Sequence, residues 1–130
     1  MAGSYGCTDN TAATSDGTGT AATFYLPGGM DIDPSAGAFL LIADTYNHCV
    51  RKVTVSSLPG TTSVWAGTCS LTAQGYADGT GQANIGFYYP RSLAISANSE
   101  FVYVLDGISV HMVTMTSAGV CGAWGVERCC

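Results

Sequence analysis

Two histidines, His48 and His111, are the side chains of this chain best suited to acid–base or metal chemistry. A catalytic histidine or a metal ligand needs a second residue at a matching spacing, and neither histidine has one. Asp31 and Asp33 form an Asp-x-Asp pair that points to one side of a strand and would suit a hard cation such as calcium. Asp33 also precedes Pro34, and turn formation is the favoured interpretation of that pair. The sequence therefore predicts no catalytic residue, no metal site and no cofactor.

A polar cluster of Asp44, Asn47, His48 and Arg51 surrounds the turn between two predicted strands. Asp44 and Arg51 could pair across this turn, with Asn47 and His48 capping backbone groups between them. The cluster would serve either as a binding face or as a structural support of the turn. The structural role is favoured, because such residues commonly satisfy local backbone groups. Asp106 stands at the equivalent position in the second half of the chain, where the Asn-His and Arg-Lys letters are missing.

The chain has six cysteines and no C-x-x-C spacing, which favours disulfides over a zinc site. Cys49 and Cys69 lie in one predicted hairpin and could pair, closing a loop whose restraint stabilises by about 3 kcal/mol in the chain-entropy model. Adjacent cysteines rarely bond to each other, so one of Cys129 and Cys130 is expected to pair with Cys121. The other, or Cys7, is expected to bond outside the chain.

The net charge is −5, with only four basic residues among 130. Nucleic-acid binding is disfavoured because it needs a basic surface. The longest apolar run, 36–43, is far shorter than the roughly 20 residues of a membrane-spanning helix. The first residues, 1–4, lack the basic and apolar regions of a signal peptide. The cysteines nevertheless predict an extracellular or cell-surface location, which suggests an excerpt of a longer protein. Serines and threonines in the connecting segments could carry O-linked sugars.

Asp16-Gly17-Thr18-Gly19 recurs as Asp78-Gly79-Thr80-Gly81, 78 − 16 = 62 residues later. Small residues, an aromatic residue, a proline and strand-like runs follow each copy. A repeat of this length is one supersecondary unit that needs neighbours to bury its apolar face. The linker motif, made of Asp16, Gly17 and Gly19 and of Asp78, Gly79 and Gly81, therefore marks where each unit begins.

Strand patterns fill both units, and no useful segment has the apolar spacing of a helix. The predicted strands are 29–32, 38–43, 48–55, 61–66, 92–96, 101–105, 109–115 and 120–124. Four short antiparallel strands followed by a glycine-rich crossover describe a β-propeller blade. The predicted class is all-β, with two four-stranded blades that are incomplete alone, since propellers have about four to eight. The predicted divisions are 1–15 (edge and linker of a preceding blade), 16–67 (blade), 68–77 (linker), 78–125 (degenerate blade) and 126–130 (cysteine-containing tail).

The first unit resembles an NHL repeat. The resemblance rests on Asp16-Gly17-x-Gly19, Phe24, Pro27, the stretch Leu41–Val53 around Asn47-His48-Cys49, and Val64-Trp65-Ala66-Gly67. It implies a rigid platform that binds a protein partner, either further copies of the chain or the rest of a longer one. The alternatives are a sugar- or peptide-binding platform and a fragment of an NHL-related metal-dependent lyase or hydrolase. The expected function is a non-enzymatic structural or interaction module of a surface or filament protein.

Overall fold

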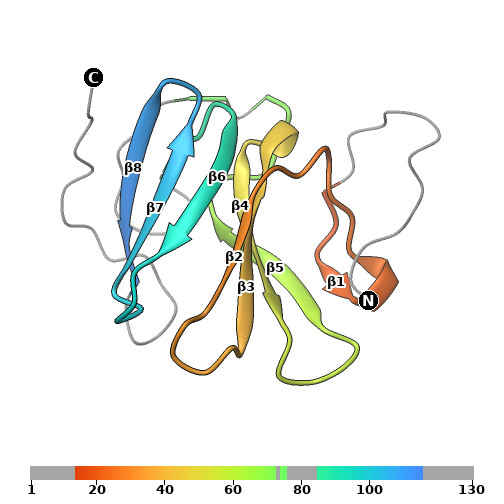
Figure 1. The fold of residues 1–130 in the computed structure, drawn as a ribbon. Helices are drawn as coiled ribbons and strands as arrows, with labels where there is room; N and C mark the ends of the chain where they lie inside the picture. The colour runs from red at the N-terminus through yellow and green to blue at the C-terminus, as the bar shows by residue number, and fades with distance from the viewer. Residues whose placement is uncertain (1–13, 73, 76–84, 116–130) are drawn as a thin grey trace.

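The computed structural model describes residues 14–72, 74–75 and 85–115, which form two antiparallel β-sheets standing side by side (Figure 1). The first sheet, blade 1, has the strand order β1-β5-β4-β3-β2, and the second, blade 2, has the order β6-β7-β8. The strands are β1 (Gly17–Thr18), β2 (Met30–Ile32), β3 (Phe39–Asp44), β4 (Cys49–Thr54), β5 (Thr61–Ala66), β6 (Pro90–Ile95), β7 (Phe101–Asp106) and β8 (Ser109–Thr114). Two 3-10 turns, η1 (Gly19–Ala21) and η2 (Thr45–Asn47), complete the described elements. No described segment forms a helix long and apolar enough to cross a membrane.

The all-β class with two propeller-type blades is confirmed, and the strand boundaries follow the sequence pattern. β3 is a continuous apolar run, and β5 is rich in β-branched residues that favour strands. Gly107, with a φ of +57°, helps to close the two-residue hairpin between β7 and β8. The predicted strands in the described residues agree with the observed ones to within two residues. The predicted strand 120–124 lies outside the described residues.

The first linker motif contains a strand of blade 1, which corrects the prediction of a four-stranded blade. Gly17 and Thr18 form β1 and pair with Thr62 and Thr61 of β5, so blade 1 has five strands. Gly19 then turns the chain with a φ of +61°, a conformation that favours glycine. The short strand β1 covers the outer edge of β5, which would otherwise expose unpaired backbone groups. The second copy, at 78–81, lies outside the described residues.

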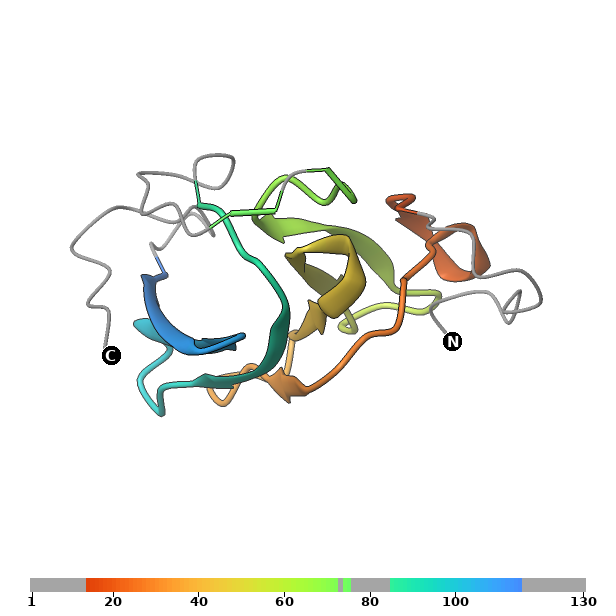
Figure 2. The same ribbon diagram turned by 90° about the horizontal axis from the view of Figure 1, so that it is seen from above.

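The apolar core lies between the two blades rather than within either one (Figures 1 and 2). Trp65 of β5 and Phe87, which precedes β6, are its largest side chains, and both are buried. The core members are Leu41, Ala43, Val50, Trp65, Ala66, Ile85, Phe87, Leu93, Val102, Val104 and Val113. Each blade contributes one face to this core. On the opposite face of blade 1, the leading segment covers Arg51, while Leu40 and Ile42 remain only half-buried.

Polar contacts join the inner strands of the two blades. Gly29 N donates to Arg91 O at 2.7 Å, and Asp31 Oδ2 accepts a hydrogen bond from Ile95 N at 2.8 Å. A Cβ atom at Gly28 would lie 2.4 Å from Arg91 O, so only glycine allows this close approach. The inner strands are thus fixed against each other by one hydrogen bond between main chains and one between a main-chain amide and a carboxylate.

Asp33 shows the expected turn chemistry and also contacts blade 2. Its Oδ1 accepts hydrogen bonds from Ser35 N at 3.1 Å and Ser35 Oγ at 2.8 Å. Ser99, in the turn between β6 and β7, donates to the same oxygen at 3.0 Å. Asp31 and Asp33 therefore use their carboxylates to bind protein donors.

Candidate functional site

Arg51 and Asp44 form a buried ion pair where η2 connects β3 to β4. Arg51 Nη1 lies 3.2 Å from Asp44 Oδ2, and both side chains are fully buried. Arg51 lies directly opposite Ile42 in the β3–β4 ladder, so these two side chains share one face of the sheet. Asp44 lies two residues beyond Ile42 on β3, and its side chain is therefore on the same face as that of Arg51. The predicted contact between Asp44 and Arg51 is confirmed.

Arg51 also fastens the segment that leads into blade 1. Its Nη2 lies 2.7 Å from Asp16 Oδ1 and donates to Ser15 O at 2.9 Å. Its Nη1 donates to Thr23 O at 3.1 Å, and the guanidinium lies 5.2 Å from the centre of the Phe24 ring. The planar guanidinium can bind several acceptors at once. The sequence identified Asp16 only as part of the linker motif and missed its ion pair with Arg51.

Asp44 collects hydrogen bonds from three directions. Tyr25 N donates to Oδ1 at 2.8 Å, while Asn47 Nδ2 donates to Oδ2 at 2.8 Å alongside Arg51. Burial raises the pKa of the Asp44 carboxyl above its ordinary value, and the donors from Asn47 and Tyr25 and the charge of Arg51 oppose that rise. The carboxylate thus depends on these partners to remain ionised inside the protein.

Asn47 and His48 both make hydrogen bonds at the turn between β3 and β4. Asn47 Nδ2 donates a hydrogen bond to the Asp44 carboxylate. His48 has a left-handed backbone with a φ of +56°, and its N–H donates to Thr45 O at 3.3 Å. The His48 ring reaches the other blade, because its Nδ1 donates a hydrogen bond to the carbonyl oxygen of Tyr88. The Asn-His letters therefore stabilise both the turn and the contact between blades.

Blade 2 contains a second buried cluster around Asp106 at the end of β7. Its carboxylate accepts hydrogen bonds from Tyr88 N at 2.9 Å and Tyr89 N at 2.6 Å. His111 Nε2 lies 3.3 Å from Asp106 Oδ2, and both side chains are buried. The His111 ring meets the Phe87 ring edge-on, with centroids 5.3 Å apart. Asp106 thus holds the segment leading into blade 2, as Asp44 holds the one leading into blade 1.

The strand register makes Arg51 and His111 equivalent, because each lies opposite the residue two positions before the strand-end aspartate. The aspartates are 106 − 44 = 62 residues apart, whereas Arg51 and His111 are 111 − 51 = 60 apart. The hairpin of blade 2 is two residues shorter, so alignment at the repeat spacing does not pair them. The sequence therefore indicated no partner for His111. Allowing for a hairpin two residues shorter in blade 2 would have aligned His111 with Arg51 and revealed its contact with Asp106.

The arrangement in blade 2 contains serine, histidine and aspartate but is not a nucleophilic triad. Ser109 Oγ lies 3.2 Å from His111 Nε2, the same nitrogen that faces Asp106. A triad needs the acid and the nucleophile on opposite ring nitrogens. His111 is also fully buried, out of reach of a substrate. Within the described residues, no three His, Cys, Asp or Glu side chains gather as a metal site would require.

Cys49 and Cys69 form a disulfide, which confirms the predicted hairpin pairing. It joins the first residue of β4 to the segment just after β5, across a sequence separation of 20. Cys7, Cys121, Cys129 and Cys130 lie outside the described residues, and their pairing stays a prediction.

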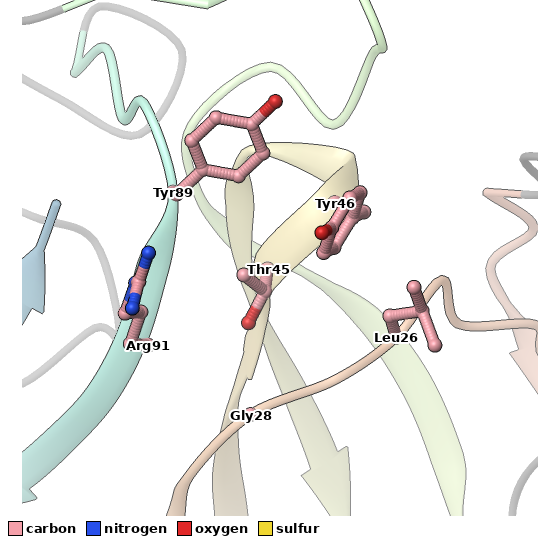
Figure 3. A pocket seen from close by; sticks show the side chains of 6 residues that line it. All are labelled: Leu26, Gly28, Thr45, Tyr46, Tyr89 and Arg91. Carbon is pink, nitrogen blue, oxygen red and sulfur yellow. The ribbon is translucent and has the colours of Figure 1, made fainter.

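A pocket of about 400 Å³ opens between the two blades beside the β3–β4 turn. Figure 3 shows Tyr46 and Tyr89 with their rings above Thr45 and Gly28, and Arg91 and Leu26 on opposite sides. The two rings meet edge-to-face, with centroids 5.4 Å apart. None of these residues was predicted as a site, because they are close only after the blades pack together.

No family model and no curated protein matches the chain. Similar folds occur among solved structures. One is a structural genomics protein of unknown function from Bacteroides thetaiotaomicron, with 26% identity and a TM-score of 0.60 over 75% of this chain and 22% of that one. Another is an auxiliary nutrient binding protein from Bacteroides ovatus, with 25% identity and a TM-score of 0.60 over 74% of this chain and 24% of that one.

A further structure from Bacteroides thetaiotaomicron carries a provisional description as a phosphatase. It is 23% identical, with a TM-score of 0.60 over 90% of this chain and 26% of that one. At this identity the likeness shows the fold alone. The chain spans about a quarter of the length of all three structures. These neighbours agree with a β-propeller-type fold for the two blades.

Proposed function

We propose that the two blades are a non-enzymatic, extracellular interaction module whose outer faces bind equivalent propeller blades. In the isolated chain, further copies supply those blades by head-to-tail packing. The observation that carries the proposal is the opposite burial of equivalent positions in the two blades.

One face of the sheet is covered in blade 2 and open in blade 1. Val102 and Val104 of β7 are fully buried against blade 1. The equivalent residues, 62 positions earlier, are Leu40 and Ile42 of β3, and they are only half-buried. They line an apolar groove of about 290 Å³ on the outer side of blade 1, together with Phe24, Met30, Val53, Val55, Leu58 and Gly60.

The other face is covered in blade 1 and open in blade 2. Leu41 and Ala43 of β3 are fully buried in the core between the blades. The equivalent residues of β7, Tyr103 and Leu105, are 43% and 44% exposed. Apolar patches on an exposed sheet face commonly mark an interaction site. Because each open face is the counterpart of a face that is covered in the internal interface, blade 2 of one copy can pack on blade 1 of the next.

The resemblance to NHL repeats and the greater length of the similar solved structures also support a larger propeller. Head-to-tail contacts of this kind close into a ring when the rotation between units permits it. The Cys49–Cys69 disulfide supports an oxidising, extracellular setting.

Sedimentation of the chain over a range of concentrations tests this proposal. The wild type should gain mass as concentration rises, and Ile42→Lys should remain a folded monomer because it places a charge in the groove. Ile108→Lys is the matched control, since Ile108 is 91% exposed at a hairpin tip, and it should associate like the wild type. A wild type that stays monomeric, or an Ile42→Lys chain that assembles normally, would refute head-to-tail packing.

Ligand binding by the propeller is a second candidate function. The pocket of Tyr46, Tyr89 and Arg91 favours it, and one similar structure is named as an auxiliary nutrient binding protein. Binding in this pocket does not depend on assembly, because both of its walls come from one chain.

A further inference from the structure

The pocket between the blades has a fixed floor. Gly28 N donates to Ala43 O at 2.9 Å, and Gly29 N donates to Arg91 O at 2.7 Å. Thr45 Oγ1 donates to Pro90 O at 2.7 Å. These groups are occupied by protein partners, so the floor is held in place before any ligand arrives. Its volume of about 400 Å³ lies within the range of about 300–1,000 Å³ that is usual for small-molecule sites.

The polar groups left for a ligand belong to three side chains. Within the described residues, the phenolic hydroxyls of Tyr46 and Tyr89 and the guanidinium of Arg91 form no hydrogen bond or ion pair. Tyr46 is 42% exposed, Tyr89 is half-buried and Arg91 is exposed. Figure 3 shows the two rings and Arg91 around one opening.

Arg91 differs from the other described cations. Arg51 is buried between Asp16 and Asp44, and the Lys52 ammonium lies 4.3 Å from the centre of the Phe39 ring. A guanidinium beside a pocket binds a carboxylate through two parallel N–H donors. The net charge of −5 opposes the approach of a polyanion, so a small ligand with a single acidic group fits best.

We propose that this pocket binds a carboxylated sugar of the uronic-acid type. The carboxylate pairs with Arg91, the apolar face of the sugar ring lies against Tyr46 or Tyr89, and the phenolic hydroxyls bind its hydroxyl groups. A peptide would need backbone donors and acceptors, and those of the pocket floor are already paired within the protein. The proposal extends the second candidate function and is independent of the head-to-tail packing.

Calorimetric or NMR titration of the full chain with glucuronic acid tests the proposal. Glucose, acetate and an acetylated dipeptide with a free carboxyl terminus are the comparison ligands. We expect millimolar binding of glucuronic acid, with glucose and acetate each weaker by about tenfold or more, because each retains only part of the contacts. Chemical-shift changes should centre on Tyr46, Tyr89 and Arg91.

Three variants separate the contributions. Arg91→Gln should weaken glucuronic acid by about ten- to a hundredfold and leave glucose unchanged, because it removes only the charge-assisted bonds. Tyr89→Leu should weaken both sugars. Lys52→Gln removes a cation away from the pocket and should bind like the wild type. Absence of glucuronic acid binding, equal binding of acetate, tighter binding of the dipeptide, or an unchanged Arg91→Gln variant would each overturn the proposal.

Discussion

Blade 1 and blade 2 hold their leading segments with the same buried aspartate but with different basic partners. Asp44 receives one backbone N–H, an Asn47 amide and the Arg51 guanidinium. Asp106 receives backbone N–H groups of two consecutive residues and lies beside the His111 imidazole. The comparison shows that the buried carboxylate needs hydrogen-bond donors in both blades, while the residues that supply those donors can differ.

The basic residue reaches further in blade 1. Arg51 contacts acceptors in the leading segment as well as the strand-end aspartate, so it joins three parts of the blade. The polar contacts that the structure shows for the His111 ring are with Asp106 and Ser109, both within blade 2. Blade 1 should therefore depend on its cation more than blade 2 does, and the following variants test that difference.

Replacing Arg51 by methionine should have the largest effect. The substitution leaves Asp44 buried without its cation and Asp16 without its partner, and breaking a buried pair typically costs about 3–5 kcal/mol. Chemical denaturation should show this loss in the free energy of unfolding. Lys52→Met is the matched control on the same strand, and its cost should be below about 1 kcal/mol. Comparable costs for the two substitutions would contradict the assigned role of Arg51.

The pH dependence of Arg51→Met sharpens the same comparison. The charge and donors of Arg51 oppose the rise in the pKa of Asp44, so the pKa should rise further in the variant. A carboxyl whose folded-state pKa is raised favours folding in its protonated form. Lowering the pH from neutral toward about pH 4 should therefore shrink the stability deficit relative to wild type. A deficit that is constant over this range would show that charge burial is not its cause.

Removing the disulfide by the double substitution of Cys49 and Cys69 with alanine should cost about 3 kcal/mol, because the closed loop has about 20 residues. Ser109 stands at the position in blade 2 that Cys49 occupies in blade 1, since both face the strand-end aspartate. Hydrogen exchange should show the loss of protection concentrated in β4 and β5. Equal loss in β7 and β8 would indicate that the two blades unfold as one unit.

Substituting His111 with leucine should have a smaller effect than Arg51→Met. Asp106 retains the donors of Tyr88 and Tyr89, so the cost should be about 1–3 kcal/mol, typical of a lost buried hydrogen bond. Unfolding by denaturant measures it, with Met112→Leu as the control because its side chain points to the opposite face of β8. If His111→Leu costs as much as Arg51→Met, the proposed difference between the blades is wrong.

Much of the fold could be predicted from local signals. The apolar run of β3 and the β-branched letters of β5 define strands without any knowledge of the tertiary structure. The pairing of Cys49 with Cys69 also follows from their place in one hairpin. Such features depend on neighbours in sequence, which the letters display directly.

Other features depend on packing between distant segments. Arg91 and Tyr46 line one pocket because the two blades pack together. Their local sequence contains no pattern that predicts this contact. The role of His111 was hidden by the shorter hairpin of blade 2. The β1 strand was missed because two residues carry no periodic pattern, and its pairing with β5 is set by the tertiary fold.

The smallest expected effect distinguishes the turns that follow the first strand of each blade. Asp33 of blade 1 corresponds by register to Ser96 of blade 2, so only blade 1 carries a titratable group there. The hydroxyl of Ser35 lowers the pKa of Asp33 below its ordinary value of 3.8, and Ser99 of blade 2 contributes less. A lowered folded-state pKa adds stability that is present above the ordinary value and lost as the pH falls through the folded-state pKa. NMR titration should show the Asp33 pKa rising in Ser35→Ala and rising less in Ser99→Ala. The reverse order would mean that the contact between blades, rather than the turn, controls this carboxyl.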